Sequence, residues 1–593
     1  MRIHQEGAIH LTFCALLTSA AVLLGTTVAK AGTPPPLTSE QGVVAADHEL
    51  ASRVGASVLA NGGNAMDAAA ATALALGVVS PLSSGIGGGG FALVYDAEAG
   101  ETRAFDFRES APEALTPESF LVDGEPDASL AQRGGLAVGV PGEVAGLSHL
   151  VETFGNLPFS QSVAPPCRLA HAGFSLGWFV ATQAGPFADR VSDPDSLAGW
   201  LYDDGEPARR GDHVRRPRLA RTLHYLGRYG PEAFYEGPIG RDIVDTVQSD
   251  GGVMTMDDLA NYEVIEREPV TGSYRDYEIA SMPLPSSGGL VILKALGILE
   301  AYEDATGFSF ADEPPGSSAP MHILAEALKH AFADRARYLG DADEARAVAE
   351  RFLDPDRYAE LAERIDPERV LLPERYGDQD LEAAAGVQPD DRGTSHFCVI
   401  DGEGNAVSLT TTINHYYGAK LVGEKSGVVL NNEIDDFAVE PGAENLFGLV
   451  QAAANVVGPG KRPLSSMSPT LVFEDGELVG CFGGSGGPRI ISNTLQGFLN
   501  VFARGMDAAE AVSTPRIHHQ WSPDELVVED PPRDVAQALS ARGHDIDLST
   551  YITAVQAVVV REDGTREAAS DPRKGGLPAA EPDRRGAGGE GDR

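Results

Sequence analysis

Hydrophobic and polar residues alternate most regularly between residues 395 and 414. Residues 395–400 and 406–414 each follow the two-residue period of a β-strand, and the sequence Asp-Gly-Glu-Gly-Asn between them favours a tight turn. Together these segments predict a β-hairpin with Thr394 at its open end. A similar alternation over residues 466–482 indicates further strands.

Helical periodicity dominates the long stretch between residues 130 and 390. Residues 321–339 and 355–365 are amphipathic, which is typical of helices that cover a core. Nearer the N-terminus, residues 46–59 have an amphipathic helix pattern, and residues 65–76 are Ala-rich and nearly all apolar, which predicts a buried helix. We expect the stretch from 130 to 390 to act as scaffold and covering layer.

The glycine run from Gly85 to Gly90 formally satisfies the G-x-G-x-x-G pattern of dinucleotide-binding folds. That motif requires a helix directly after the glycines. Residues 91–95 (Phe-Ala-Leu-Val-Tyr) have a strand pattern instead, which argues against a nucleotide site. The run is expected to form a turn in which the backbone passes close to a ligand or to another segment.

The first 31 residues have the pattern of a secretory signal peptide. A weakly basic start precedes an apolar stretch over residues 9–24, and Ala29-Lys30-Ala31 offers an A-x-A cleavage site. The apolar stretch is short for a stable membrane span. We therefore expect export to the periplasm or the exterior, without membrane association once the signal peptide is removed.

Composition restricts the possible partners. The 593 residues carry a formal net charge of −42, and few of the 45 basic residues are Lys. Such an acidic surface argues against nucleic acid or an anionic membrane as a partner. It is compatible with a saline habitat, where counterions screen the repulsion, and also with an ordinary acidic exported protein. The cysteines of the mature chain, Cys167, Cys398 and Cys481, lack metal-type spacing.

Thr394 is the candidate nucleophile. A Thr hydroxyl alone reacts poorly, but cleavage of the bond after Gly393 would give Thr394 a free α-amine, which titrates near ~8 and can act as the adjacent base. Gly393 suits such a cut because it tolerates strained backbone geometry. These residues alone favour an ordinary hairpin, and Cys398, in an apolar strand pattern, is a weaker rival nucleophile.

A second nucleophile motif lies at Gly483-Gly484-Ser485-Gly486-Gly487, which satisfies the G-x-S-x-G elbow of α/β-hydrolases. A strand pattern over residues 478–482 precedes it, and a helical pattern over residues 490–502 follows. No Asp-then-His order stands out among the later residues. A serine hydrolase that uses Ser485 is therefore the alternative from a different class.

Several motifs stand in one order along the chain: Thr394-Ser395-His396, Thr412-Ile413-Asn414, Asn431-Asn432-Glu433-Ile434-Asp435-Asp436, Arg462-Pro463-Leu464-Ser465-Ser466 and Gly486-Gly487. This series closely resembles the small subunit of γ-glutamyltranspeptidases. The resemblance continues upstream through Gly62-Gly63-Asn64-Ala65-Met66-Asp67 and Asp106-Phe107-Arg108-Glu109, and downstream through His518-His519-Gln520-Trp521 and Ser570-Asp571-Pro572-Arg573. It covers nearly everything between residues 40 and 574.

The resemblance implies an α+β fold, the four-layer αββα sandwich of N-terminal-nucleophile hydrolases, formed by two fragments of one self-cleaved precursor. After a signal peptide at residues 1–31, residues 32–393 would form a large subunit and residues 394–593 a small subunit that associates with it. Residues 575–593 contain little apolar surface and are expected to be a disordered tail.

The resemblance also assigns roles to individual residues. In the catalytic set, one Thr is the nucleophile, a second Thr orients its hydroxyl, and two glycine N–H groups form the oxyanion hole: Thr394, Thr412, Gly486 and Gly487. In the substrate-binding set, one group holds the donor α-carboxylate (Arg108, Ser465 and Ser466) and another holds its α-ammonium (Asn414, Glu433 and Asp436). A zwitterionic substrate end needs donors and acceptors on opposite sides, and this set supplies both.

The implied reaction is cleavage of the γ-glutamyl amide of glutathione and similar compounds, with transfer of the glutamyl group to water, an amino acid or a peptide. No cofactor or metal is implied. An acylase of the same superfamily, for instance one that acts on cephalosporin-type β-lactams, is the nearest alternative. An uncut, inactive binding protein is a third.

Residues 437–463 form a long irregular segment, and long ordered loops are often lids. In relatives with a covering loop, an aromatic residue, commonly Tyr, closes the gate. Phe447 stands at the matching position here and has no hydroxyl to bond Asn414. We therefore expect weaker closure of the lid.

Overall fold

The computed structural model describes residues 34–188, 199–203, 206–378, 393–550 and 552–582. The expected signal peptide and most of the segment before Thr394 lie outside these residues. Within the unit from Pro36 onward, the described residues form two antiparallel sheets of seven strands each.

The first sheet contains the predicted hairpin. Its strands, in spatial order, are β11 (Ile265–Arg267), β4 (Glu101–Phe107), β3 (Gly89–Asp96), β15 (Ala406–Thr412), β14 (Ser395–Ile400), β2 (Val43–Ala46) and β23 (Ala579–Ala580). In the hairpin β14–β15, Ser395 pairs with Thr411 and Ile400 with Ala406. The strand expected after the glycine run is confirmed as β3.

The second sheet contains the other predicted strands. Its spatial order is β1 (Leu37–Ser39), β22 (Arg566–Ser570), β21 (Val555–Val560), β17 (Glu477–Gly484), β16 (Thr470–Glu474), β13 (Tyr277–Ser281) and β12 (Val270–Tyr274). The alternation that predicted strands over residues 466–482 is confirmed by β16 and β17, which pair from Thr470–Phe482 to Glu474–Glu477.

The two sheets stack face to face, and the strand alternation shows how. On β14, Cys398 and Ile400 point into a buried layer that also holds Leu471, Cys481 and Val558 of the other sheet. Phe397 and Val399 on β14 belong to a different core, which is shared with helix α2 (Ala65–Val79). One apolar set thus joins the sheets and the other joins each sheet to helices, which confirms the expected αββα layers. Cys398 and Cys481 are core residues, as expected.

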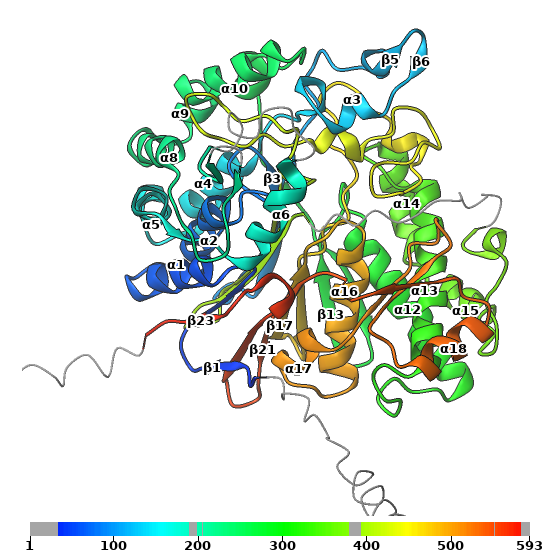
Figure 1. Cartoon of the computed structure of the whole chain (residues 1–593). Coiled ribbons are helices and arrows are strands. Elements are labelled where there is room, and N and C mark those ends of the chain that lie inside the picture. Colours follow the sequence, from blue (N-terminus) through cyan, green and yellow to red (C-terminus); the bar gives the residue numbers. More distant parts are fainter. Residues whose placement is uncertain (1–33, 189–198, 204–205, 379–392, 551, 583–593) are drawn as a thin grey trace, which may run out of the picture. The chain divides into compact units, whose positions relative to one another are not determined.

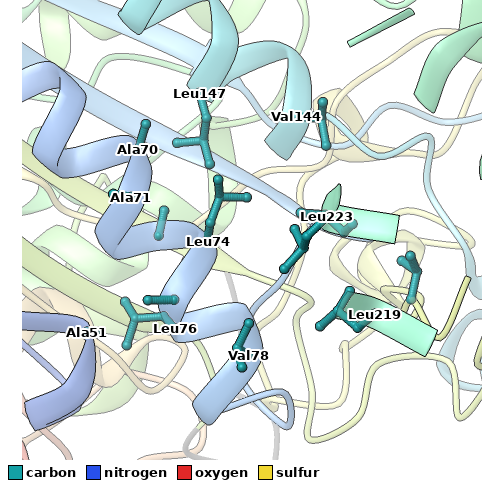
Figure 2. Packing of buried hydrophobic residues seen from close by; sticks show 14 of the residues in the cluster. Ala51, Ala70, Ala71, Leu74, Leu76, Val78, Val144, Leu147, Leu219 and Leu223 are labelled. Atoms are coloured by element: carbon teal, nitrogen blue, oxygen red, sulfur yellow. The ribbon is translucent and has the colours of Figure 1, made fainter. Parts of the chain in front are cut away.

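Helices cover both outer faces (Figure 1). The first sheet is covered by α1 (Glu49–Ala60), α2 (Ala65–Val79), α4 (Glu143–Phe154), α5 (Phe159–Ala172) and α8 (Pro217–Tyr229). The second is covered by α12 (Gly288–Thr306), α13 (Ser318–Tyr338), α15 (Pro355–Ala362), α16 (Arg489–Phe498) and α17 (Ala508–Ser513). Figure 2 shows Leu74 of α2 close to Leu147 of α4. The Ala-rich face of α2 lets these helices approach closely.

The described chain contains further α-helices and strands. The helices are α3 (Ser129–Gln132), α6 (Trp178–Ala188), α9 (Glu232–Tyr235), α10 (Pro238–Ser249), α11 (Met256–Ala260), α14 (Asp343–Phe352) and α18 (Arg533–Ala541). The strands are β5 (Leu121–Val122), β6 (Glu125–Pro126), β7 (Phe174–Ser175), β8 (Tyr202–Asp203), β9 (Glu206–Pro207), β10 (His213–Val214), β18 (Ile517–His518), β19 (Leu526–Glu529) and β20 (Ile546–Ser549). Among the described helices, none is both long and apolar enough to cross a bilayer.

Each sheet contains strands from both sides of the Gly393–Thr394 bond. In the first sheet, β15 pairs with β3 and β14 pairs with β2. In the second, β16 pairs with β13 and β22 pairs with β1. Hydrogen-bonded ladders therefore hold the two parts of the chain together independently of the covalent bond between them.

The expected disordered tail is wrong for its first part. Lys574 ends a short 3₁₀ turn, η7 (Pro572–Lys574), and the chain then continues to β23, which pairs with β2. Residues 575–582 have little apolar surface, but small residues suffice where the segment lies against a sheet edge. Residues 583–593 lie outside the described residues.

Glu143, the first residue of α4, offers a test of the packing on the first sheet. Its carboxyl group is fully buried, and burial raises the pKa of Glu143 from 4.5 to about 8. The folded state therefore binds this proton more tightly than the unfolded state, so this carboxyl costs increasing stability as pH rises from about 4.5 to 8.

We expect Glu143→Gln, which has no proton to lose, to flatten that decline. The variant should gain up to about 3 kcal/mol over the wild type at pH 7.5 and much less at pH 5. Thermal unfolding midpoints at both pH values measure the difference. Equal midpoint changes at pH 5 and pH 7.5 would contradict the expectation.

Candidate functional site

Thr394 and Thr412 face each other at the open end of the hairpin. The β14–β15 register, extended by one pair, places them opposite one another, and their Oγ1 atoms lie 2.9 Å apart. Thr412 Oγ1 also accepts a hydrogen bond of 2.8 Å from the Asn414 N–H, so its own proton is free to point at Thr394. Thr394 has a φ of +70°, a strained conformation for a β-branched residue.

The glycine run packs tightly behind this pair. A Cβ on Gly88 would collide with the Thr412 carbonyl oxygen, and a Cβ on Gly87 with that of Val429. The expectation that the backbone here passes close to another segment is confirmed. The run lets the backbone approach Thr412 at Gly88 and Val429 at Gly87.

Arg108 directly follows β4 and is buried. Its guanidinium forms ion pairs with Glu433 and Asp436, the first and last residues of η4 (Glu433–Asp436). Nε donates to the Pro463 carbonyl at 3.3 Å, and the backbone N–H donates to Asp106 at 3.0 Å. These contacts fix the planar fork in one orientation.

A third carboxyl group, Glu109, adjoins this ion-pair cluster. Burial raises the pKa of Glu109 to about 8, and it raises the pKa values of Glu433 and Asp436, while Arg108 opposes the rise in all three. Three buried carboxylates cannot all be ionised beside one guanidinium. The nearby Glu109 carboxyl group also raises the pKa of Glu433, so the cluster favours protonation of at least one carboxyl group.

Ser465 and Ser466 lie on a loop that is anchored to the N-terminal end of α12. The Ser465 N–H donates to the Pro285 carbonyl at 2.8 Å, and the Ser465 carbonyl accepts from Ser287 Oγ at 2.6 Å. Ser287 Oγ in turn accepts from Arg335 Nε at 2.9 Å. These hydrogen bonds fix the loop on the side away from the cavity, and both serines line the cavity wall.

Gly486 and Gly487 form the turn between β17 and α16. Their φ values are +110° and +57°, and a Cβ on Gly487 would collide with the Phe447 ring. Neither backbone N–H group has a hydrogen-bond acceptor among the described residues. Glycine is required here both by the conformation and by the close ring.

The geometry argues against the rival nucleophiles. Ser485 occupies the expected strand–turn–helix position, but its Oγ is fully buried and has no hydrogen-bond partner among the described residues. A serine nucleophile needs a base within hydrogen-bond reach. Burial between the sheets raises the pKa of the Cys398 thiol well above its usual value, which disfavours the reactive thiolate.

One cavity brings the predicted residues together. Every predicted site residue except Gly486 lines it: Arg108, Thr394, Thr412, Asn414, Glu433, Asp436, Ser465, Ser466 and Gly487. The space is about 20 Å³, room for about one water molecule. Phe447 lines the same cavity and packs on the His415 ring at 4.5 Å between centroids.

A family model described as gamma-glutamyltranspeptidase matches residues 51–581. The chain belongs to the γ-glutamyltranspeptidase family. A glutathione hydrolase proenzyme of Escherichia coli (strain K12) is 38% identical over 579 residues, which is 95% of this chain and 98% of that protein.

Two solved structures extend the family comparison. A cephalosporin acylase from Bacillus halodurans is similar with a TM-score of 0.81 and 27% identity, over 94% of this chain and 98% of that one. A γ-glutamyltranspeptidase from Helicobacter pylori is similar with a TM-score of 0.52 and 34% identity, over 59% of this chain and 96% of that one. The N-terminal-nucleophile hydrolase fold is thereby confirmed for this γ-glutamyltranspeptidase family member.

Sequence reasoning missed several residues at the site of this family member. His415 supports the Phe447 ring, Asn445 Nδ2 donates to Asp436 at 3.0 Å, and Glu109 joins the carboxyl cluster. Lys574 donates to the Thr394 carbonyl at 2.7 Å, although it adjoins the expected tail. Two features of the sequence could have drawn attention to Lys574: the chain has few Lys residues, and this one directly follows the Asp571–Arg573 motif.

Among the described residues, His322, Glu326 and His544 form a group that could hold a metal ion. The two rings are hydrogen-bonded to each other at 2.8 Å, His322 also bonds the Asp366 carbonyl at 2.8 Å, and Tyr376 donates to Glu326 at 2.7 Å. These contacts occupy most of the donor atoms. We interpret the group as a hydrogen-bonded link between α13 and the residue 544 segment.

Proposed function

We propose that this protein is a self-processing γ-glutamyl transferase and hydrolase that acts on glutathione and related γ-glutamyl compounds. The observation that carries the proposal is the Thr394–Thr412 contact of 2.9 Å in the same cavity as the Arg108 ion-pair cluster. A nucleophile and a zwitterion-binding set thus share one small space. Both are needed to cleave an amide on the side chain of an amino acid.

The proposed processing divides the precursor after Gly393. A signal peptide (1–31) directs export, and the cut yields a large subunit (32–393) and a small subunit (394–593). The strained φ of Thr394 supports this step, because cleavage releases the strain. The proenzyme name of the Escherichia coli relative supports a processed two-chain form.

In the mature form, Thr394 Oγ attacks the γ-carbonyl carbon of the donor. Its α-amine takes the hydroxyl proton and returns it to the leaving amine, while Thr412 orients the hydroxyl. The N–H groups of Gly486 and Gly487 stabilise the developing oxyanion. The resulting ester between the glutamyl group and Thr394 is then cleaved by water or by the amine of an amino acid or peptide.

The donor's α-amino acid end fits the charges around the nucleophile. Arg108, with Ser465 and Ser466, receives the α-carboxylate. Asn414, Glu433 and Asp436 receive the α-ammonium. Donor binding therefore replaces part of the Arg108 ion-pair cluster, and the 20 Å³ cavity must enlarge by movement of the Phe447 segment.

A pair of substrates separates this proposal from the acylase alternative. γ-Glutamyl-p-nitroanilide and glutaryl-p-nitroanilide present the same amide and differ only in the α-ammonium. A site with buried carboxylates for that ammonium should prefer the γ-glutamyl substrate by about 10⁴-fold or more in kcat/KM. Equal rates, or a preference for glutaryl, would exclude the proposed donor site in favour of an acylase.

The lid supplies a further prediction. Phe447 and Asn414 line the same cavity, and we expect a Tyr hydroxyl at position 447 to form a hydrogen bond with the Asn414 amide. One added hydrogen bond is worth about 1 kcal/mol. We expect Phe447→Tyr to raise the ratio of transfer to hydrolysis by up to about fivefold, because a tighter lid excludes water.

The measurement is the product ratio at a fixed concentration of glycylglycine as acceptor. Phe447→Leu, which removes the ring without adding a donor, is the matched control and should shift the ratio toward hydrolysis. An unchanged ratio of transfer to hydrolysis in Phe447→Tyr would show that a hydroxyl at position 447 does not tighten the lid.

A further inference from the structure

The ammonium group of Lys574 lies against the bond that is proposed to be cut. Its Nζ donates to the Thr394 carbonyl at 2.7 Å and lies 3.5 Å from the carbonyl oxygen of Gly393. Lys574 is only 4% exposed, so bulk water screens its electrostatic interactions with these two carbonyl groups only weakly. A buried cation therefore sits beside the scissile carbonyl.

The turn that carries Lys574 is rigidly held. Asp571 caps η7 by accepting from the Arg573 N–H at 2.9 Å. Its other oxygen accepts from Arg516 at 2.7 Å and from the Val555 N–H of β21 at 3.1 Å. The Lys574 backbone is thus fixed to the second sheet, and only its side chain reaches across to Thr394.

The charge of Lys574 is partly balanced from the opposite side. Nζ lies 3.3 Å from Asp47, which follows β2, and Gln556 donates to the other Asp47 oxygen. The ammonium also lies 5.2 Å from the centre of the Phe179 ring. One carboxylate and one ring face hold the cation in place without turning it away from the two carbonyl groups.

We propose that the Lys574 ammonium group stabilises the oxyanion that forms on the Gly393 carbonyl oxygen during self-cleavage. This inference rests on the proposed processing at Thr394. Thr394 Oγ attacks the Gly393 carbonyl carbon, and the negative charge moves to the Gly393 oxygen beside Nζ. When the C–N bond breaks, the Thr394 nitrogen takes the hydroxyl proton, and an ester joins Gly393 to Thr394 Oγ. Water then hydrolyses the ester to the Gly393 carboxylate and the free Thr394 hydroxyl.

The contact with the Thr394 carbonyl serves the same step. This contact holds Thr394 in place, and the Thr394 hydroxyl must attack the carbonyl group of the preceding residue. The distance of 3.5 Å between Lys574 Nζ and the Gly393 oxygen is expected to shorten as negative charge develops on that oxygen. A cation held before the reaction needs no reorganisation during it.

The test follows cleavage of the full-length precursor after cell-free synthesis, by denaturing electrophoresis and N-terminal sequencing of the smaller fragment. Lys574→Met removes the charge and keeps the length, Lys574→Arg keeps the charge, and Gln556→Leu disturbs the same buried cluster without touching either carbonyl. We expect Lys574→Met to be cut at least about 100-fold more slowly than the wild type. Lys574→Arg should recover part of the rate, and Gln556→Leu should be cut normally.

The proposal is overturned if folded Lys574→Met is cut at the wild-type rate, if Lys574→Arg is no faster than Lys574→Met, or if Gln556→Leu is slowed as much. Near-ultraviolet circular dichroism establishes that each variant is folded. Should Lys574→Met fail to fold, the other two variants decide: Lys574→Arg slowed and Gln556→Leu normal supports the role, and the reverse overturns it. A wild-type chain that is never cut would instead remove the proposed processing itself.

Discussion

Thr394→Ala is expected to remain a single chain and to lose γ-glutamyl hydrolysis by about 10⁴-fold or more. The substitution removes the hydroxyl that serves both as the processing and as the catalytic nucleophile. Thr394→Ser keeps a hydroxyl but loses the methyl group that restricts its rotamer and helps to strain φ. We expect it to be cut and to turn over roughly 10-fold more slowly than the wild type.

The fragments provide the measurement for Thr394. Wild-type protein should run as two fragments on a denaturing gel, and the smaller should begin Thr-Ser-His-Phe. Ser485→Ala, which changes the rival motif, is the control and should be cut normally, because its buried hydroxyl contacts no base among the described residues. An intact wild-type chain with normal γ-glutamyl hydrolysis would contradict the central assignment.

Asp436→Asn should lower kcat/KM for γ-glutamyl-p-nitroanilide by about 10- to 100-fold, mainly through KM. The substitution preserves shape but leaves the donor ammonium with one carboxylate fewer, and a hydrogen bond to a charged group contributes about 1.5–3 kcal/mol. Folding should be retained, because Arg108 still pairs with Glu433. Self-cleavage should also proceed normally, since Asp436 has no part in that step.

Arg108→Lys tests the opposite end of the same donor. Lys keeps the charge but loses the fork that bonds Glu433 and Asp436 at once, so donor binding should weaken by about 10-fold while cleavage into fragments continues. The decisive comparison is the preference for γ-glutamyl over glutaryl anilide. Asp436→Asn should reduce that preference, whereas Arg108→Lys should weaken both substrates alike. Normal kinetics in either variant would place the donor elsewhere.

Local patterns were sufficient to predict the hairpin around Thr394. The strand patterns and the turn residues between them predicted the hairpin, whereas the register that places Thr412 opposite Thr394 came from the structure, in which both faces of β14 and β15 are buried. The glycine run was also predictable, because the strand after it excluded a nucleotide loop.

Long-range contacts were not predictable from any local pattern. Lys574 is about 180 residues from Thr394 along the chain, and β23 consists of two alanines whose role depends on the neighbouring edge of β2. Glu109 had no local signal beyond its place next to Arg108, and only the fold brings it close to Glu433. The roles of Arg108 and η4 came from the resemblance, because isolated carboxylate pairs are usually solvent-exposed.

The shared sheets have a consequence for the lifetime of the cut protein. Once the Gly393–Thr394 bond is cut as proposed, complete unfolding would release two separate polypeptides, and the native state could return only if they meet again. The intact precursor refolds in a first-order process, whereas recovery of the mature form becomes second order and falls with dilution. The half-life of the mature protein is then set by the rate at which it unfolds. The equilibrium between folded and unfolded forms has little influence on it.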